Sequence, residues 1–119
     1  MKSLIIINDA PYGTEKAYNA LRLAMQIQKD YENQEVSVFL MADAVGCAIP
    51  NQNTPNGYYN IERMLTSVIN KRGSVKICTS CVETRGLKEM KFDVSKNHEV
   101  TSTVQIDTGQ SHPKTTVHT

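Results

Sequence analysis

The sequence of 119 residues predicts one α/β domain with three layers, in which helices cover both faces of a mostly parallel sheet. Three short apolar runs, at residues 4–7, 36–42 and 75–77, have the composition of buried strands. Two amphipathic segments, at residues 15–31 and 60–72, alternate with them and have helical spacing. Because strands joined through helices in this way run in the same direction, the sheet should be parallel.

The individual elements follow from local patterns. Residues 4–7 form an unbroken apolar run, typical of a strand buried on both faces. The helix at 15–31 places apolar residues at spacings of three and four, with Gln28 as the polar exception. The helix at 60–72 has Asn60 as a candidate N-cap. Between them, residues 44–59 contain two prolines and two glycines and predict a long loop, with a helical turn near 44–48.

Composition excludes several classes of protein. The net charge of +1 gives no argument for nucleic acid or an anionic membrane as a partner. No apolar run approaches the roughly 20 residues that span a bilayer, and the apolar start is too short for a signal sequence. Three cysteines, an odd number, favour reduced thiols over a disulfide framework. We therefore expect a cytoplasmic protein.

Residues 74–86 carry the strongest functional signal. A β-branched strand places Cys78 at its carboxyl end, a short helix is predicted over 79–85, and Cys81 follows at CxxC spacing. Backbone N–H groups at a helix start, together with Arg85, favour a thiolate at Cys78. Cys81 can form a disulfide with an oxidised Cys78, or it packs as a small hydrophobe. Sulfur chemistry at Cys78 therefore competes with a purely structural interpretation.

Other sites are not supported by the sequence. Residues 8–15 lie between a strand and a helix but lack the glycine patterns of phosphate-binding loops. Zinc would need two ligands besides Cys78 and Cys81, and all three histidines lie beyond residue 97 in a polar segment. No histidine in the predicted body can activate a cysteine nucleophile. Cys47, among small residues, is assigned to packing. We predict neither a metal nor a cofactor.

Four stretches resemble the DsrE/DsrF-like sulfur-relay family, and within it the YchN-like branch. They cover residues 1 to about 90 and have the family's order and spacing: the first strand ending in residues 8–13, the helical segment 19–24, the strand end 39–45, and residues 57–61 leading to 75–81 with Arg85 and Gly86.

This resemblance implies a flavodoxin-like domain over residues 1–94 that assembles as a homo-oligomer, a trimer or hexamer. It also implies that Cys78 carries sulfane sulfur as a persulfide, taken from a donor protein and passed to an acceptor protein. Cys81 and Arg85 are the expected supporting residues. The residues expected to line the pocket are Asn8, Asp9, Tyr12, Gly13, Asp43 and Tyr58.

Two alternatives to a persulfide sulfurtransferase or carrier stay open. One is a dithiol redox protein that uses Cys78 and Cys81 as a pair. The other is an oligomeric or binding protein without catalytic activity, whose cysteines are incidental. We expect no nucleic acid and no membrane as a partner under any of the three.

Residues 95–119 depart from the family pattern, which ends in a helix and a final strand. This polar segment has few large apolar side chains to offset about 1–2 kcal/mol of backbone entropy per residue. We therefore expect an irregular or disordered tail that contributes little to folding. Residues 101–107 are the one stretch that could pair as an edge strand.

Overall fold

The computed structural model describes residues 2–90, 98–101 and 114–118. Its sheet has the strand order β4-β3-β2-β1-β5, and each neighbouring pair is parallel. The strands are β1 (Lys2–Ile7), β2 (Glu35–Leu40), β3 (Ser74–Cys78), β4 (His98–Thr101) and β5 (Lys114–His118). The helices are α1 (Lys16–Asp30), α2 (Ile61–Asn70), α3 (Thr79–Thr84) and the 3-10 helix η1 (Ala42–Ala48). The predicted α/β class and parallel sheet are confirmed.

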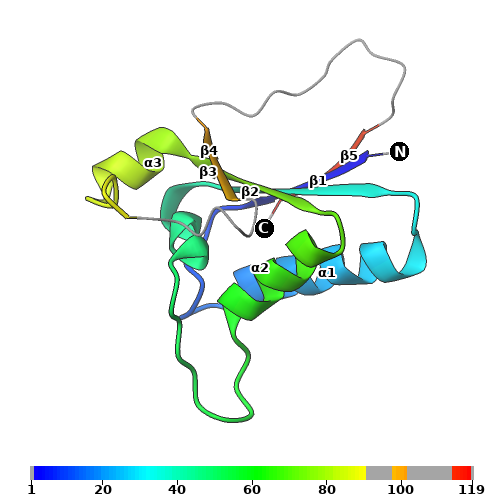
Figure 1. Ribbon diagram of the computed structural model, residues 1–119, viewed down its shortest axis with the longest axis horizontal. Coiled ribbons are helices and arrows are strands. Elements are labelled where there is room, and N and C mark those ends of the chain that lie inside the picture. The colour runs from blue at the N-terminus through cyan, green and yellow to red at the C-terminus, as the bar shows by residue number, and fades with distance from the viewer. Residues whose placement is uncertain (1, 91–97, 102–113, 119) are drawn as a thin grey trace.

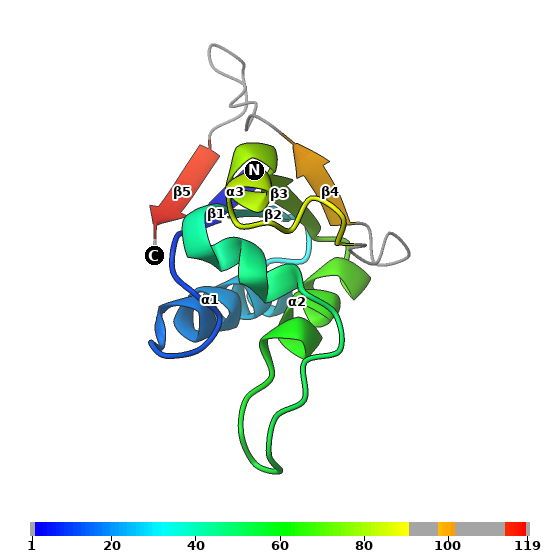
Figure 2. The ribbon, with the colours of Figure 1, turned by 90° about the vertical axis from the view of Figure 1, so that its left-hand side faces the viewer.

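The helices lie on both sides of the sheet. The long helices α1 and α2 cover the same face (Figure 1), and α3 lies on the opposite side near the carboxyl edge (Figure 2). Because β1, β2 and β3 are added in one direction across the sheet, crossovers of one hand place α1 and α2 on one face. The 3-10 helix η1 confirms the helical turn that was expected near residues 44–48.

The core lies between the sheet and the two long helices. In β1, Ser3, Ile5 and Ile7 are buried, whereas Leu4 and Ile6 are only half-buried. The strand therefore alternates, and the prediction of equal burial on both faces is wrong for β1. The physical reason is the unequal cover, because two long helices pack on one face and the described helix on the other face has six residues.

The polar exception in the α1 stripe, Gln28, joins the two long helices. Its Nε2 donates to the carbonyl oxygens of Val68, at 2.9 Å, and Lys71, at 3.3 Å. Val68 lies in the last turn of α2, and Lys71 directly follows the helix. Carbonyl groups at a helix end have no hydrogen-bond partner within the helix. Gly73 lies against the same turn, and a Cβ built on it would come 2.6 Å from the Val68 carbonyl oxygen. Glycine is required here by a close approach of two backbones.

Gly73→Ala should destabilise the fold by roughly 1–3 kcal/mol, because the added methyl group overlaps the backbone of Val68. Urea denaturation followed by circular dichroism measures this change. Lys71→Ala, at an exposed neighbouring position, serves as the matched control and should change stability by less than about 0.5 kcal/mol. Equal stability of the two variants would contradict the close approach.

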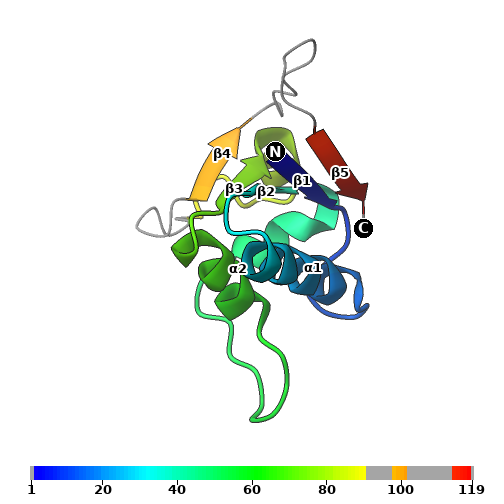
Figure 3. The same cartoon turned by 90° about the vertical axis from the view of Figure 1, so that its right-hand side faces the viewer.

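Both edge strands come from the segment predicted to be an irregular tail. β4 pairs with β3, and β5 pairs with β1 through a register from Lys2↔Lys114 to Ile6↔His118 (Figure 3). At these residues the structure differs from the sequence prediction. An edge strand is held by one backbone ladder, and threonine and valine, which dominate β5, favour extended backbone. Most of the expected strand at 101–107, and the proposed domain boundary at residue 94, lie outside the described residues.

Candidate functional site

Cys78 is the last residue of β3 and the N-cap of α3. The buried residues Val75 and Ile77 hold β3 in the core, so the strand delivers Cys78 to the carboxyl edge of the sheet. There α3 and η1 lie close together (Figure 2). Cys78 is 8% exposed, so its sulfur sits at the boundary between core and solvent.

Two groups of α3 lie within hydrogen-bond distance of the Cys78 sulfur. The backbone N–H of Cys81 donates to Sγ at 3.4 Å, and the Ser80 hydroxyl lies 3.4 Å from the same atom. Burial alone raises the pKa of Cys78, but hydrogen bonds from the side chains and backbone of Cys81 and Ser80 outweigh it, so the pKa falls below the ordinary 9.0. The site therefore favours a thiolate at Cys78 more than free cysteine does.

Cys81 is half-buried and has the opposite tendency. Its side-chain hydrogen bond to Cys78, followed by burial, raises the pKa of Cys81. The backbone N–H of Ala42 donates to Cys81 Sγ at 3.2 Å, which ties the start of η1 to α3. Ala42 has a φ of 51°, a left-handed conformation that costs energy for a residue other than glycine. With the pKa of Cys78 lowered and that of Cys81 raised, Cys78 is the thiol of the pair that ionises first.

Arg85 forms an ion pair with Asp43. Its guanidinium binds Asp43 at 2.9 Å through both Nε and one terminal nitrogen, and donates to the Cys81 carbonyl oxygen at 3.1 Å. The charge of Arg85 is therefore balanced by Asp43, and the cation lowers the pKa of Cys81 among smaller influences. Arg85 and Asp43 hold η1 against α3 close to Cys81. That Arg85 supports the Cys78 thiolate stays a prediction.

Cys47 is a structural thiol. It lies in η1 with no exposed surface, and burial raises the pKa of Cys47 from an ordinary 9.0 to about 12. The assignment of Cys47 to packing agrees with this environment.

Tyr12 and Tyr58, two of the residues predicted to line a pocket, form an aromatic cluster with Tyr59 and Tyr18. Tyr59 stacks on Tyr58 and Tyr18 with ring centroids 4.5 and 4.4 Å apart. The Tyr12 hydroxyl donates to Gln52 at 2.6 Å and accepts from the Ile61 N–H at 3.0 Å, so it anchors the long loop to the start of α2. Tyr58 is half-exposed at 50%. The hydrogen bond with Tyr58, then burial, raises the pKa of Tyr59 to about 12.

The remaining predicted residues belong to the loop after β1. Asn8 follows the strand directly, Asp9 forms an ion pair with Lys16 at 3.3 Å, and Gly13 has a φ of 103°. This loop also lies at the carboxyl edge, and its Pro11 packs against η1 near Gly46. The structure thus brings Cys78, Cys81, Asp43 and Arg85 into one cluster. That all the predicted residues line a common pocket stays a prediction.

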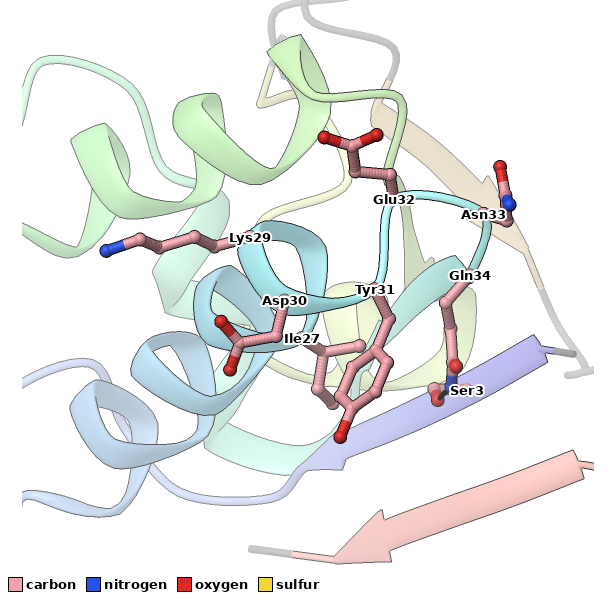
Figure 4. Close-up of a pocket in the computed structure, with 8 residues that line it drawn as sticks. All are labelled: Ser3, Ile27, Lys29, Asp30, Tyr31, Glu32, Asn33 and Gln34. Carbon is pink, nitrogen blue, oxygen red and sulfur yellow. Dashed lines mark hydrogen bonds between the residues drawn. The ribbon is translucent and has the colours of Figure 1, made fainter.

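A cavity of about 850 Å³ lies elsewhere, at the amino edge of the sheet (Figure 4). Its lining residues come from the start of β1, the end of α1 and the segment that leads to β2, and they include the exposed Tyr31: Ser3, Ile27, Lys29, Asp30, Tyr31, Glu32, Asn33 and Gln34. Because parallel strands carry their ligands at the opposite, carboxyl edge, we do not assign function to this cavity. Within residues that the structure describes, no group of three His, Cys, Asp or Glu side chains is placed to hold a metal ion.

Sequence reasoning missed three groups that hold the site. The Ala42 amide is a backbone group, and no sequence signal marks it. Ser80 lies inside the Cys-Thr-Ser-Cys segment, where a hydroxyl two residues after the cysteine could have been recognised as a local partner. Gln52 bonds the carbonyl oxygens of Cys47 and Ile49 and the N–H of Glu62, and so fixes the long loop from within it.

Several known proteins are similar to this chain in sequence and in fold. The model of the DsrE/DsrF-like family matches residues 1–111. Protein YchN of Escherichia coli (strain K12) is 37% identical over 89 residues, which is 75% of each chain. The uncharacterized protein MJ0989 of Methanocaldococcus jannaschii is 42% identical over 89 residues, also 75% of each. The crystal structure of ychN protein from E. coli matches with a TM-score of 0.83 at 32% identity, covering 99% of this chain and 98% of that one.

Proposed function

Because the chain belongs to the DsrE/DsrF-like family, we propose that it carries sulfane sulfur as a persulfide on Cys78. The observation that carries this proposal is the set of hydrogen bonds from Cys81 and Ser80 to the Cys78 sulfur. They lower the pKa of Cys78, whereas the other two thiols have raised pKa values. Cys78 is therefore the thiol best suited to nucleophilic attack on sulfur.

The transfer needs no external oxidant. The Cys78 thiolate attacks the terminal sulfur of a donor persulfide, R–S–SH, and the donor thiolate leaves with the electrons of the broken S–S bond. The product is Cys78–S–SH, and attack by an acceptor thiolate on its terminal sulfur repeats the same exchange. The donors around Cys78 Sγ stabilise the thiolate at both the start and the end of the cycle.

The partners in this proposal are sulfur donor and acceptor proteins and further copies of the chain, as a trimer or hexamer. A cytoplasmic location belongs to the same proposal. Among the helices described, none has the length and apolar composition to cross a membrane.

Incubation with a cysteine persulfide donor should add one sulfur atom to the chain, and Cys78→Ser should abolish the addition. Intact-mass measurement followed by peptide mapping locates the added sulfur. Cys47→Ala is the matched control, because it removes the thiol with the pKa raised to about 12 and should leave loading unchanged. Loading that persists in folded Cys78→Ser would contradict the proposal.

A further inference from the structure

We infer that Cys81 is a resolving thiol that releases the sulfur held on Cys78 as hydrogen sulfide and leaves a Cys78–Cys81 disulfide. This inference rests on the proposed persulfide at Cys78. It gives the stored sulfur a second fate besides transfer to an acceptor protein. The inference rests on the contacts of Cys81 with Cys78 on one side and with Ala42 on the other.

The two cysteines are already placed for a disulfide. Cys78 is the N-cap of α3 and Cys81 lies three residues later, a separation at which helical neighbours have Cβ atoms roughly 5–6 Å apart. The Cys81 N–H reaches Cys78 Sγ at 3.4 Å, and the two side chains share a hydrogen bond. Disulfides accept Cα separations of roughly 4.4–6.8 Å, so closure needs side-chain rotation and little backbone movement.

Cys81 is held in this position from the other side. The Ala42 N–H points at Cys81 Sγ at 3.2 Å, from a turn that keeps Ala42 in a left-handed conformation. Arg85 binds the Cys81 carbonyl oxygen at 3.1 Å and is itself fixed by Asp43. These contacts restrain both the backbone and the sulfur of Cys81. A thiol restrained beside the sulfur it would attack has a high effective concentration.

The step balances without an added oxidant. Cys81–SH and Cys78–S–S⁻ give Cys81–S–S–Cys78 and HS⁻. The Cys81 sulfur bonds to Cys78 Sγ, and the bond from Cys78 Sγ to the terminal sulfur breaks. The terminal sulfur leaves with the electron pair and takes the Cys81 proton, so the sulfane sulfur is reduced while the two cysteines are oxidised. A dithiol reductant reopens the disulfide by thiol–disulfide exchange.

The test follows one turnover in the full-length protein. Wild type, Cys81→Ser and Cys47→Ala are loaded with inorganic polysulfide, freed of excess reagent and kept without added thiol. Sulfide release is measured colorimetrically and the protein by intact mass. Wild type and Cys47→Ala should release sulfide while the chain loses two hydrogens, at a rate independent of protein concentration. Cys81→Ser should keep its added sulfur at least about tenfold longer. Serine is nearly isosteric and can still accept from the Ala42 N–H, and circular dichroism verifies its fold.

The outcomes separate this inference from the proposed function. If wild type keeps its sulfur as long as Cys81→Ser, or releases it at a rate proportional to protein concentration, Cys81 is not a resolving thiol and the carrier function stands. If neither protein gains sulfur and no sulfide appears, both proposals are wrong. Retention by Cys81→Ser with release by wild type and Cys47→Ala supports both.

Discussion

Iodoacetamide at neutral pH should modify Cys78 first and leave Cys47 unmodified in the folded protein. With a pKa of about 12, Cys47 is a thiolate in only about one molecule in 10⁵ at pH 7. The lowered pKa of Cys78 places its thiolate fraction above about one in a hundred, the fraction of a thiol at 9.0. Because the thiolate is the reactive form, the rate ratio should exceed roughly 10³ before the complete burial of Cys47 is considered.

The measurement is peptide mapping over time across a pH series. In denaturant all three thiols should react at similar rates, because their environments are lost, and this is the control. Raising the pH should increase Cys78 labelling first. Cys47 labelling should require a much higher pH or unfolding. Dominant modification of Cys81 or Cys47 at neutral pH would show that the site is assigned to the wrong cysteine.

The raised pKa of Cys47 should also make the stability of the fold fall at alkaline pH. Burial keeps Cys47 protonated in the folded chain up to about 12, whereas the unfolded thiol ionises at 9.0. As the pH rises, Cys47 therefore ionises in the unfolded state before it ionises in the folded state. The contribution of Cys47 to stability is complete below pH 9.0 and is lost as the pH rises toward 12. Cys47→Ala should remove this component of alkaline destabilisation.

Truncation after Pro113, which removes β5, should destabilise the protein by about 2–5 kcal/mol and cause aggregation. Five residue pairs join β5 to β1, and each net hydrogen bond of such a ladder contributes about 0.5–1.5 kcal/mol. Their loss also exposes the edge of β1, whose Leu4–Ile7 run is the most apolar stretch of the sheet. An unprotected apolar edge pairs with other chains.

Chemical denaturation and light scattering measure the two effects. Truncation after His118 removes one residue and keeps β5 whole, so it should behave as the full-length chain. The sequence alone predicts the opposite result, that the tail is dispensable. Unchanged stability and solubility of the longer truncation would therefore favour the sequence-based expectation over the pairing of β5 with β1.

The body of the fold was predictable because its signals are local and redundant. Periodic apolar residues identified α1 and α2 within two residues at each end, and the β-branched run before Cys78 identified β3. β4 and β5 were not predictable in the same way. Their formation depends on backbone ladders to β3 and β1, which are distant in sequence, and the polar side chains of edge strands give little periodic signal.

The candidate site was predictable in part for a similar reason. CxxC spacing at a strand end is a local pattern and pointed to Cys78. The partner of Arg85 was not predictable, because Asp43 lies 42 residues away in sequence and the ion pair exists only once η1 packs on α3. The Ala42 amide, which binds Cys81, belongs to the backbone and is set by the fold alone.

The pairing of the last strand with the first has a consequence for biosynthesis. β1 is synthesised before the other described strands, yet the strand on its outer side begins only at Lys114. During synthesis the isoleucine-rich β1 can pair with β2 long before its neighbour on the other side has been made. Until residues 114–118 are available, the outer edge of β1 stays open to pairing with other chains.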